Sequence, residues 1–363
     1  MSLTNESAYV EEIRFFSVPL DPDEREERIK LKLAHAQSRY ADVDFKDPYD
    51  GVINSLRSLG ISKGFHELGG LHVEPWLKPT PDPEYSPMVT VENYVVFIDA
   101  NGCKEYANKV SDFVKENIIP RIPCLIGVDH SLSGGCVKAI CDEYGPENVH
   151  FIVLDSHFDA ITSPVRCGLI QYDIETNPRT PFDPSDPYVK ERPNSYNADS
   201  FIFHLVKDGL VDPANVSVFS VSDYPPKSAF EIDDDRVRTY LDAYTSLEKK
   251  GLSILRKQQI ESNLGKVKQL LDRVRQKNLY VSIDIDVGAN SALKGARFLD
   301  YTGLTEEEIY RVIELIRRRI RKGCSLVGFD LLETDVYGAS EIHKGVKDRT
   351  YEIEANIIKR LVD

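Results

Sequence analysis

The strongest constraint on the fold is an alternation of apolar, β-type runs with amphipathic helical patterns along most of the 363 residues. Parallel strands need long crossover connections, which are usually helices that cover the faces of the sheet. The alternation therefore predicts an α/β fold with three αβα layers around a central, mostly parallel sheet. Strands are expected at 12–20, 94–98, 122–128, 149–155, 216–222, 279–286 and 324–333. Helices are expected at 47–60, 103–118, 134–145, 200–210, 263–277, 305–322 and 351–362.

Two segments interrupt this alternation. Residues 176–197 contain five prolines and are expected to be irregular, whereas residues 231–260 are highly charged and are expected to form a helical insertion. Because no linker or internal repeat is evident, residues 1–363 are predicted to form a single domain that carries these two insertions. The proline-rich segment follows the strand at 149–155, so we expect it to border any site at that strand end and to shape substrate choice.

Composition limits the partners and the compartment. A formal net charge of -14 argues against a nucleic-acid partner, since phosphate binding needs a basic surface. No apolar run approaches the roughly twenty residues of a membrane span, so no membrane partner is expected. The six cysteines form no CxxC pair, and no signal peptide opens the chain. A reducing compartment, the cytoplasm, is the expected location.

The stretch VLDSHFDA, residues 153–160, follows an apolar run that is typical of a buried strand. Side chains two apart on a strand share a face. If the strand continues, Asp155, His157 and Asp159 therefore point the same way. Burying two carboxylates with an imidazole is costly unless a positive charge compensates them, so the stretch indicates a metal site.

Other predicted strands also end in polar residues. His130 follows one strand, Asp284 and Asp286 end another, and Asp330 with Glu333 ends a third. Taken singly, such residues are more often caps or turn formers. Together they converge, because ligands of open α/β sheets bind at the carboxyl ends of the strands. Ligation by four aspartates and two histidines favours two bridged Mn(II) or similar ions over a structural zinc.

The motifs GVDHS, DSHFD, SIDID and FDLLETD, in this order, resemble those of the arginase and agmatinase (ureohydrolase) family. The resemblance implies a binuclear manganese site, a small guanidino or amidino substrate, and a homo-oligomer, either a trimer or a hexamer. It implies that Glu333 pairs with the substrate guanidinium. The implied ligands are His130 and Asp159 for one ion, His157 and Asp286 for the other, and Asp155 and Asp284 as bridges.

Several departures from the family motifs concern the substrate. Val128 replaces a glycine, VGAN replaces the family's xxDP after Asp286, and DSHFDA lacks the asparagine that arginases use. Asn197 stands where arginases and agmatinases have a proton-shuttling histidine, and an amide cannot carry a proton as imidazole does. His204, nearby in a helical pattern, is expected to be a packing residue. We therefore predict weak or absent activity on arginine.

The leading hypothesis is a metal-dependent hydrolase of a carbon–nitrogen bond in a linear guanidine or amidine, with Asp159 and Glu333 as catalytic residues. Agmatine-like, guanidino-acid and formimidoyl substrates all stay open. Arg166 is expected to form a surface salt bridge, with a substrate carboxylate as the alternative partner. Two other functions remain: a catalytically impaired relative that keeps the metals, and a deacetylase-like amide hydrolase whose single zinc would not require His130.

Overall fold

A computed structural model describes residues 12–37, 43–61, 66–343 and 345–362 of the chain. Its centre is an eight-stranded sheet in the order β2-β1-β3-β8-β7-β4-β5-β6, and all neighbouring strands are parallel. A separate antiparallel hairpin joins β9 and β10. The strands are β1 Ile13–Val18, β2 His66–Gly70, β3 Ile122–Gly127, β4 Val149–Leu154, β5 Val216–Val221, β6 Ser253–Arg256, β7 Asn278–Asp284, β8 Ser325–Leu332, β9 Ile342–His343 and β10 Val346–Lys347.

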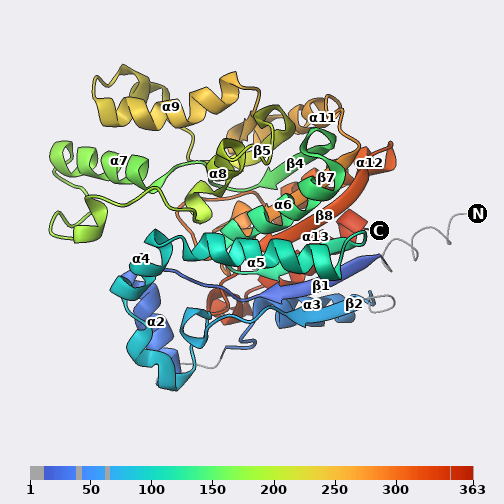
Figure 1. The fold of residues 1–363 in the computed structure, drawn as a ribbon, viewed down its shortest axis with the longest axis horizontal. Helices are drawn as coiled ribbons and strands as arrows, with labels where there is room; N and C mark the ends of the chain where they lie inside the picture. The colour runs from blue at the N-terminus through green and yellow to red at the C-terminus, as the bar shows by residue number, and fades with distance from the viewer. Residues whose placement is uncertain (1–11, 38–42, 62–65, 344, 363) are drawn as a thin grey trace, which may run out of the picture.

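Helices pack on both faces of the sheet, each over its own apolar core, so the predicted three-layer α/β architecture is confirmed (Figure 1). One face carries α3 Pro48–Ser58, α10 Lys257–Ser262, α11 Gly265–Leu271, α12 Glu306–Arg321 and α13 Thr350–Val362. The other carries α2 Glu26–Ala36, α4 Val91–Asp99, α5 Gly102–Asn117, α6 Ser133–Tyr144, α7 Ser163–Thr176, α8 Phe201–Lys207 and α9 Asp235–Lys249. The 3-10 helices are η1 Pro75–Leu77, η2 Pro83–Met88, η3 His130–Leu132, η4 Pro146–Asn148, η5 Pro187–Val189, η6 Ala198–Ser200, η7 Pro213–Asn215, η8 Lys227–Glu231, η9 Ile285–Gly288 and η10 Gly338–Ser340.

The strand predicted at 94–98 is wrong, because these residues belong to the helix α4. Thr90 caps this helix by accepting a hydrogen bond from the backbone N–H of Asn93. Tyr94 and Ile98 are buried one helical turn apart, whereas Val96 between them is 60% exposed. A five-residue apolar run fits a strand and a short helix equally well, so only the cap and the helical spacing of the buried residues distinguish them.

The predicted helical insertion at 231–260 is wrong in part. It contains α9 and most of α10, but β6 lies between them and forms an edge of the main sheet. The other edge, β2, was not predicted either, because its sequence HELGG has no apolar alternation and all five residues are exposed. The helices α2 and α7 were also missed. Whether residues 1–363 behave as a single domain stays a prediction.

The carboxyl edge of the sheet is where the site forms. In Figure 1 the chain leaves β1, β4 and β5 toward α2, α7 and α9, which extend beyond that edge of the sheet. Residues 177–197 follow α7 there and contain no regular structure except η5, as the prolines predicted. All six cysteines are buried and free. Among the described residues, no helix is both long and apolar enough to cross a membrane.

Candidate metal centre

The segment that follows β4 brings its three predicted ligands together, although by a different route from the one expected. The strand ends at Leu154, so the residues beyond it do not continue the extended conformation. His157 donates its backbone N–H to Asp155 Oδ1 over 2.6 Å, and Asp159 adopts a left-handed backbone with φ 52°. A non-glycine residue in this region costs about 1–3 kcal/mol and tends to mark functional sites. A tight turn thus converges these side chains.

Two neighbouring strand ends complete the cluster. Asp284 ends β7, and its Oδ1 accepts the backbone N–H of Asp286 in η9 over 2.8 Å. Ser156 donates its own N–H to Asp286 Oδ1 over 3.0 Å, which ties the β4 and β7 segments together. His130 lies at the start of η3, just after β3. The ends of three strands therefore fix the six predicted ligands.

The six ligands form two groups whose potential ligand atoms lie within 4.8 Å of one another. In the first group, His130 Nδ1 lies 2.7 Å from Asp159 Oδ2, 3.2 Å from Asp155 Oδ2 and 3.3 Å from Asp284 Oδ2. In the second, His157 Nδ1 lies 2.7 Å from Asp286 Oδ2 and 3.6 Å from Asp155 Oδ1. Asp155 belongs to both groups and Asp284 to the first only. His130 thus lies with Asp159, and His157 with Asp286, as expected, and Asp155 is shared by the two groups. The predicted bridging role of Asp284 does not follow from this grouping, and the assignment of all six residues as metal ligands stays a prediction.

The cluster fits cations chemically. Five of its six residues are buried, and His157 is 17% exposed at its side chain. Among the described residues, several of their buried polar atoms have no hydrogen-bond partner, namely His130 Nδ1, Asp155 Oδ2, Asp159 Oδ2 and Asp286 Oδ2. Leaving such atoms unpaired is costly, and they face one another in the cluster. Bound metal ions would be coordinated by all of these atoms at once and would so compensate for the missing hydrogen bonds.

The hydrogen bonds of His130 fix which nitrogen faces the cluster. Its Nε2 lies 2.9 Å from Ser282 Oγ, and Ser282 donates its hydroxyl proton to Asp330 Oδ1 over 2.6 Å. Because the hydroxyl proton is used for Asp330, Ser282 accepts from His130 Nε2–H. The Nδ1 lone pair then faces the carboxylates, as a metal-ligating histidine requires. Asp330, which was noted only as a strand-end carboxylate, thus orients a ligand through Ser282.

The cluster carries an excess of carboxylates, and this shifts the pKa values of its members. Burial and the neighbouring charge of Asp155 raise the pKa of Asp159 well above its usual range, and burial and Asp286 do the same for Asp284. Burial opposes ionisation of Asp155 as well, but the adjacent imidazoles of His130 and His157 lower its pKa. Four carboxylates around two imidazoles cannot all ionise without further positive charge, which bound cations would supply.

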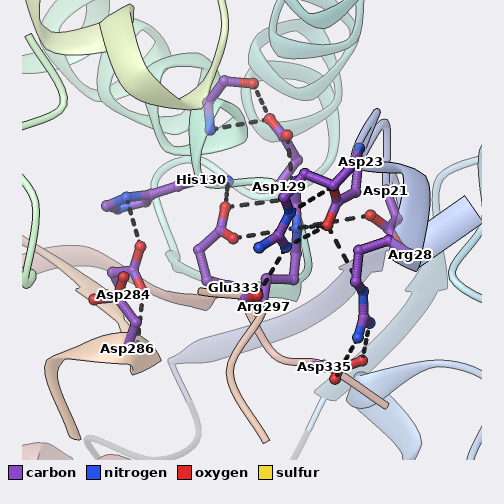
Figure 2. Close-up of polar contacts among 12 residues, drawn as sticks. Asp21, Asp23, Arg28, Asp129, His130, Asp284, Asp286, Arg297, Glu333 and Asp335 are labelled. Atoms are coloured by element: carbon purple, nitrogen blue, oxygen red, sulfur yellow. Dashed lines mark hydrogen bonds and ion pairs between the residues drawn. The ribbon is translucent and has the colours of Figure 1, made fainter. Parts of the chain in front are cut away.

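Glu333, the predicted partner of a substrate guanidinium, is paired with another residue of the chain. It follows β8 with a left-handed backbone of φ 66°, and its Oε1 accepts the backbone N–H of His130 over 2.8 Å. Its Oε2 lies 3.3 Å from Nε of Arg297 (Figure 2). Burial raises the pKa of Glu333 to about 8, although Arg297 opposes the shift. Sequence reasoning missed Arg297, which no motif signals.

Arg297 belongs to a buried charge network beside the metal-ligand cluster. Figure 2 shows its guanidinium between Glu333 on one side and the aspartates that follow β1 on the other. Its Nη1 lies 3.3 Å from Asp129 Oδ2, and its Nε lies 3.6 Å from Asp21 Oδ1 and 3.7 Å from Asp23 Oδ2. Three further cations belong to this network. Arg25 pairs with Asp23, Lys32 with Asp21, and Arg28 with Asp335.

The other residues singled out in the sequence have structural partners. Asn197 is the N-cap of η6: its backbone N–H donates to Ser200 Oγ over 3.2 Å, and its Oδ1 accepts from Ser200 Oγ over 3.1 Å. Arg166 donates from Nε and Nη2 to both carboxylate oxygens of Asp199, over 2.9 and 2.5 Å. Its carboxylate partner in this structure is therefore a residue of the chain itself. His204 is buried against the rings of Tyr196 and Phe203, as expected for a packing residue.

A cavity of about 890 Å³ opens beside the charge network. Its lining includes Arg297, Asp129 and Phe298 together with the starts of α2 and α7. Its lining also includes much of the proline-rich segment, from Phe182 to Asn197. The segment therefore lines the cavity beside the charge network, and α7 separates it from the end of β4. That it borders the metal crevice stays a prediction, since none of the six predicted ligands is among the lining residues of this cavity. The effect of the segment on substrate choice also stays a prediction.

The parallel sheet with a buried His/Asp cluster at its carboxyl edge defines an α/β protein with a ureohydrolase fold that could hold metal ions. The chain belongs to the arginase family, since the family model described as "Arginase family" matches residues 61–360. This family is generally dependent on a binuclear metal site and acts on small guanidino substrates, which supports a ureohydrolase-type enzyme. No curated protein sequence matches the chain.

Solved structures share the fold at low sequence identity. Proclavaminate amidino hydrolase from Streptomyces clavuligerus is 18% identical with a TM-score of 0.57, over 96% of this chain and 90% of that one. Arginase from Bacillus caldovelox is 16% identical with a TM-score of 0.56, over 96% and 97%. Formimidoylglutamase from Bacillus subtilis subsp. subtilis str. 168 is 14% identical with a TM-score of 0.58, over 96% and 85%.

Proposed function

We propose that the protein is a binuclear, metal-dependent hydrolase of a carbon–nitrogen bond in a small linear guanidine or amidine. The observation that supports this most directly is the pair of ligand groups that share Asp155, with buried ligand atoms that lack partners. Mn(II) suits the four carboxylates and two imidazoles. Structural neighbours named as an amidino hydrolase and a formimidoylglutamase support the substrate class.

When bound, the two ions would act as Lewis acids that activate water for attack on an electron-poor carbon. His130 and Asp159 would hold one ion and His157 and Asp286 the other, with Asp155 and Asp284 between them. Asp159 would also orient the water and carry a proton to the leaving nitrogen, since the amide of Asn197 cannot shuttle a proton and its Nδ2–H is donated to Ser163 Oγ over 3.1 Å. Glu333, predicted to pair with the cationic group of the substrate, lies beside His130 and is paired with Arg297 in this structure.

The direct test is to strip the protein with a chelator, reload it with Mn(II), and screen guanidino, formimidoyl and matched amide compounds. Release of urea, formamide or ammonia is the readout, and D155N is the matched inactive control. The expected result is turnover of at least one compound that the control abolishes. Wild-type protein that carries two ions and hydrolyses no guanidino or formimidoyl compound would contradict the proposal, and turnover of the matched amides alone would favour an amide hydrolase.

A second candidate is a catalytically impaired relative that keeps its metals. Two observations favour it: Arg297 already pairs with Glu333, and Asn197 caps η6 instead of serving as a shuttle. This candidate predicts two bound ions and no turnover in the same screen. The deacetylase-like alternative is less well supported, because His130 lies within the first ligand group. A metal count of one would revive it.

Assembly and location complete the proposal. By family resemblance we propose a homo-oligomer, either a trimer or a hexamer, which light scattering at several protein concentrations would test. Six free, buried cysteines support a reducing compartment such as the cytoplasm.

A further inference from the structure

Glu333 is the carboxylate best placed to receive a cationic group next to the metal-ligand cluster. Its Oε1 accepts the backbone N–H of the ligand His130, so the carboxylate lies directly beside the cluster. Its side chain is 1% exposed, and a buried carboxylate needs a positively charged or hydrogen-bonding partner. In this structure that partner is a guanidinium that the chain itself supplies, from Arg297.

The pair is close but poorly aligned. Nε of Arg297 lies 3.3 Å from Glu333 Oε2, and Nη1 donates to Oε1 over a long 3.5 Å. Within the described part of the chain, neither Nε of Arg297 nor Oε2 of Glu333 has a hydrogen-bond partner. A guanidinium and a carboxylate in the usual parallel fork would use both of these atoms. Arg297 is therefore held beside Glu333 mainly by the attraction between opposite charges, and aligned hydrogen bonds contribute less.

Arg297 also stands between Glu333 and the cavity. It lines the cavity together with Asp129 and Phe298, whereas Glu333 does not. Asp21 and Asp23 hold Nε from the opposite side, at 3.6 and 3.7 Å, so the guanidinium is anchored on two sides (Figure 2). A ligand that enters through the cavity thus meets Arg297 before it meets Glu333.

We propose that Arg297 is a specificity-determining residue that fills the cation-binding position of Glu333 and excludes guanidinium groups from it. This inference rests on the proposed hydrolase function and narrows its substrate. Guanidines are permanently charged and need Glu333 or an equivalent carboxylate as a counterion, so simple alkylguanidines are disfavoured. The favoured substrate presents a reacting group that is uncharged on entry, which within the proposed class is an amidine bound in its unprotonated form.

The hydrolysis of such a group balances without a further reactant. Water adds its oxygen to the planar carbon, the carbon–nitrogen bond breaks, and the leaving nitrogen takes the proton. An amidine thereby gives an amide and an amine. No charge has to be placed against Glu333 before the reaction, so Arg297 can stay where it is.

The test is a binding experiment on metal-free protein, so that it does not depend on turnover. Methylguanidinium chloride is titrated into the wild type, R297A and the double variant R297A/E333Q, with methylammonium chloride at equal ionic strength as the salt control. Thermal unfolding and titration calorimetry report binding. At about 20 mM the denaturing effect of a guanidinium salt is small. The matched control variant is R28A, which removes a guanidinium of the same network that pairs with Asp335 instead of Glu333.

We expect R297A to bind methylguanidinium at least about tenfold more tightly than the wild type, which is a difference of about 1.4 kcal/mol. Addition of E333Q should abolish this gain, and R28A should not show it. A folded R297A that binds no better than the wild type, or binds equally well without Glu333, would overturn the proposal. If the hydrolysis screen fails while this gain appears, the proposed function falls and the role of Arg297 stands.

R297A leaves Glu333 and its neighbouring aspartates undercompensated, which lowers the stability of the fold, so a second comparison covers the case in which R297A does not fold. The comparison of the wild type with E333Q then decides, since E333Q keeps Asp21, Asp23 and Asp129 around Arg297. We expect equal, weak binding of methylguanidinium to both proteins. Wild-type binding that E333Q weakens by about tenfold or more would show that Glu333 is open to external guanidinium, and would refute the inference.

Discussion

Replacement of Ser282 by alanine should weaken one metal site while leaving the fold intact. Ser282 Oγ accepts from His130 Nε2 over 2.9 Å and donates to Asp330 over 2.6 Å, so it fixes the imidazole with Nδ1 toward the carboxylates. Without the hydroxyl, the ring loses the partner that selects this tautomer and orientation. Removal of such an outer partner typically lowers metal affinity about 10- to 100-fold, or about 1.4–2.7 kcal/mol.

The loss should be unequal between the two ligand groups. His130 belongs to the first group only, and the second group is built on His157 and Asp286, whose contacts do not involve Ser282. Titration of Mn(II) into chelator-stripped S282A should therefore show one weakened site and one that changes little. The free energy of unfolding should fall by about 1–2 kcal/mol, because Asp330 keeps the hydroxyl of Tyr280 as a donor at 2.6 Å.

S217A is the matched control for this experiment. Ser217 Oγ lies 2.9 Å from Nε2 of the buried His150, which is the same kind of pair on the neighbouring strands β4 and β5, but outside both ligand groups. It should cost similar stability and leave Mn(II) binding unchanged. Wild-type affinity in a folded S282A, or an equal loss of metal affinity in S217A, would refute the orienting role of Ser282.

Three further predictions follow from the site and its surroundings. D155N should reduce the metal content from two ions to none, whereas D284N should lose at least the ion of the first group; elemental analysis would contradict the shared role of Asp155 if D155N kept one ion. E354Q should stabilise the protein relative to the wild type at pH 8 and have little effect at pH 5, as measured by urea unfolding, with the exposed E352Q as control. Burial raises the pKa of Glu354 to about 8, against an ordinary 4.5, so its contribution to stability is full below pH 4.5 and is lost as the pH rises toward 8, with an upper limit of about 5 kcal/mol. Arginine should be turned over far more slowly than about ten per second with full Mn(II) or Ni(II) occupancy, and a steady-state rate near that value would disprove the argument from Asn197.

Most of the sheet could be predicted because the sequences of buried parallel strands are continuous apolar runs. Six of the seven expected strands are present, and the seventh, 94–98, failed because five apolar residues suit a short buried helix as well. The edge strands β2 and β6 could not be found in this way. An edge strand is covered on fewer sides, so HELGG needs no apolar pattern and is stabilised by its hydrogen bonds to β1.

The metal-ligand cluster could be located from the sequence because each ligand follows or ends an apolar strand, and strand ends of a parallel sheet share one edge. The argument from alternate positions succeeded for the wrong reason, since the turn at Asp159 replaces the extended conformation that it assumed. Arg297 could not be predicted. It lies in an irregular stretch between η9 and α12, and its partners come from three separate strand ends that are distant in sequence.

The two buried charge clusters at this edge differ in a way that bears on function. In the network around Arg297, five carboxylates meet four cations of the chain, and Asp21 and Asp23 each have a close partner in Lys32 and Arg25, at 2.9 and 2.6 Å. The clusters touch where His130 donates its backbone N–H to Glu333. In the ligand cluster, four carboxylates meet two imidazoles, and ligand atoms are left without hydrogen-bond partners among the described residues. The chain thus supplies its own cations to the network around Arg297 but not to the ligand cluster at the same edge of the sheet. The ligand cluster therefore depends on positive charge from outside the chain, which is the physical argument for metal ions there.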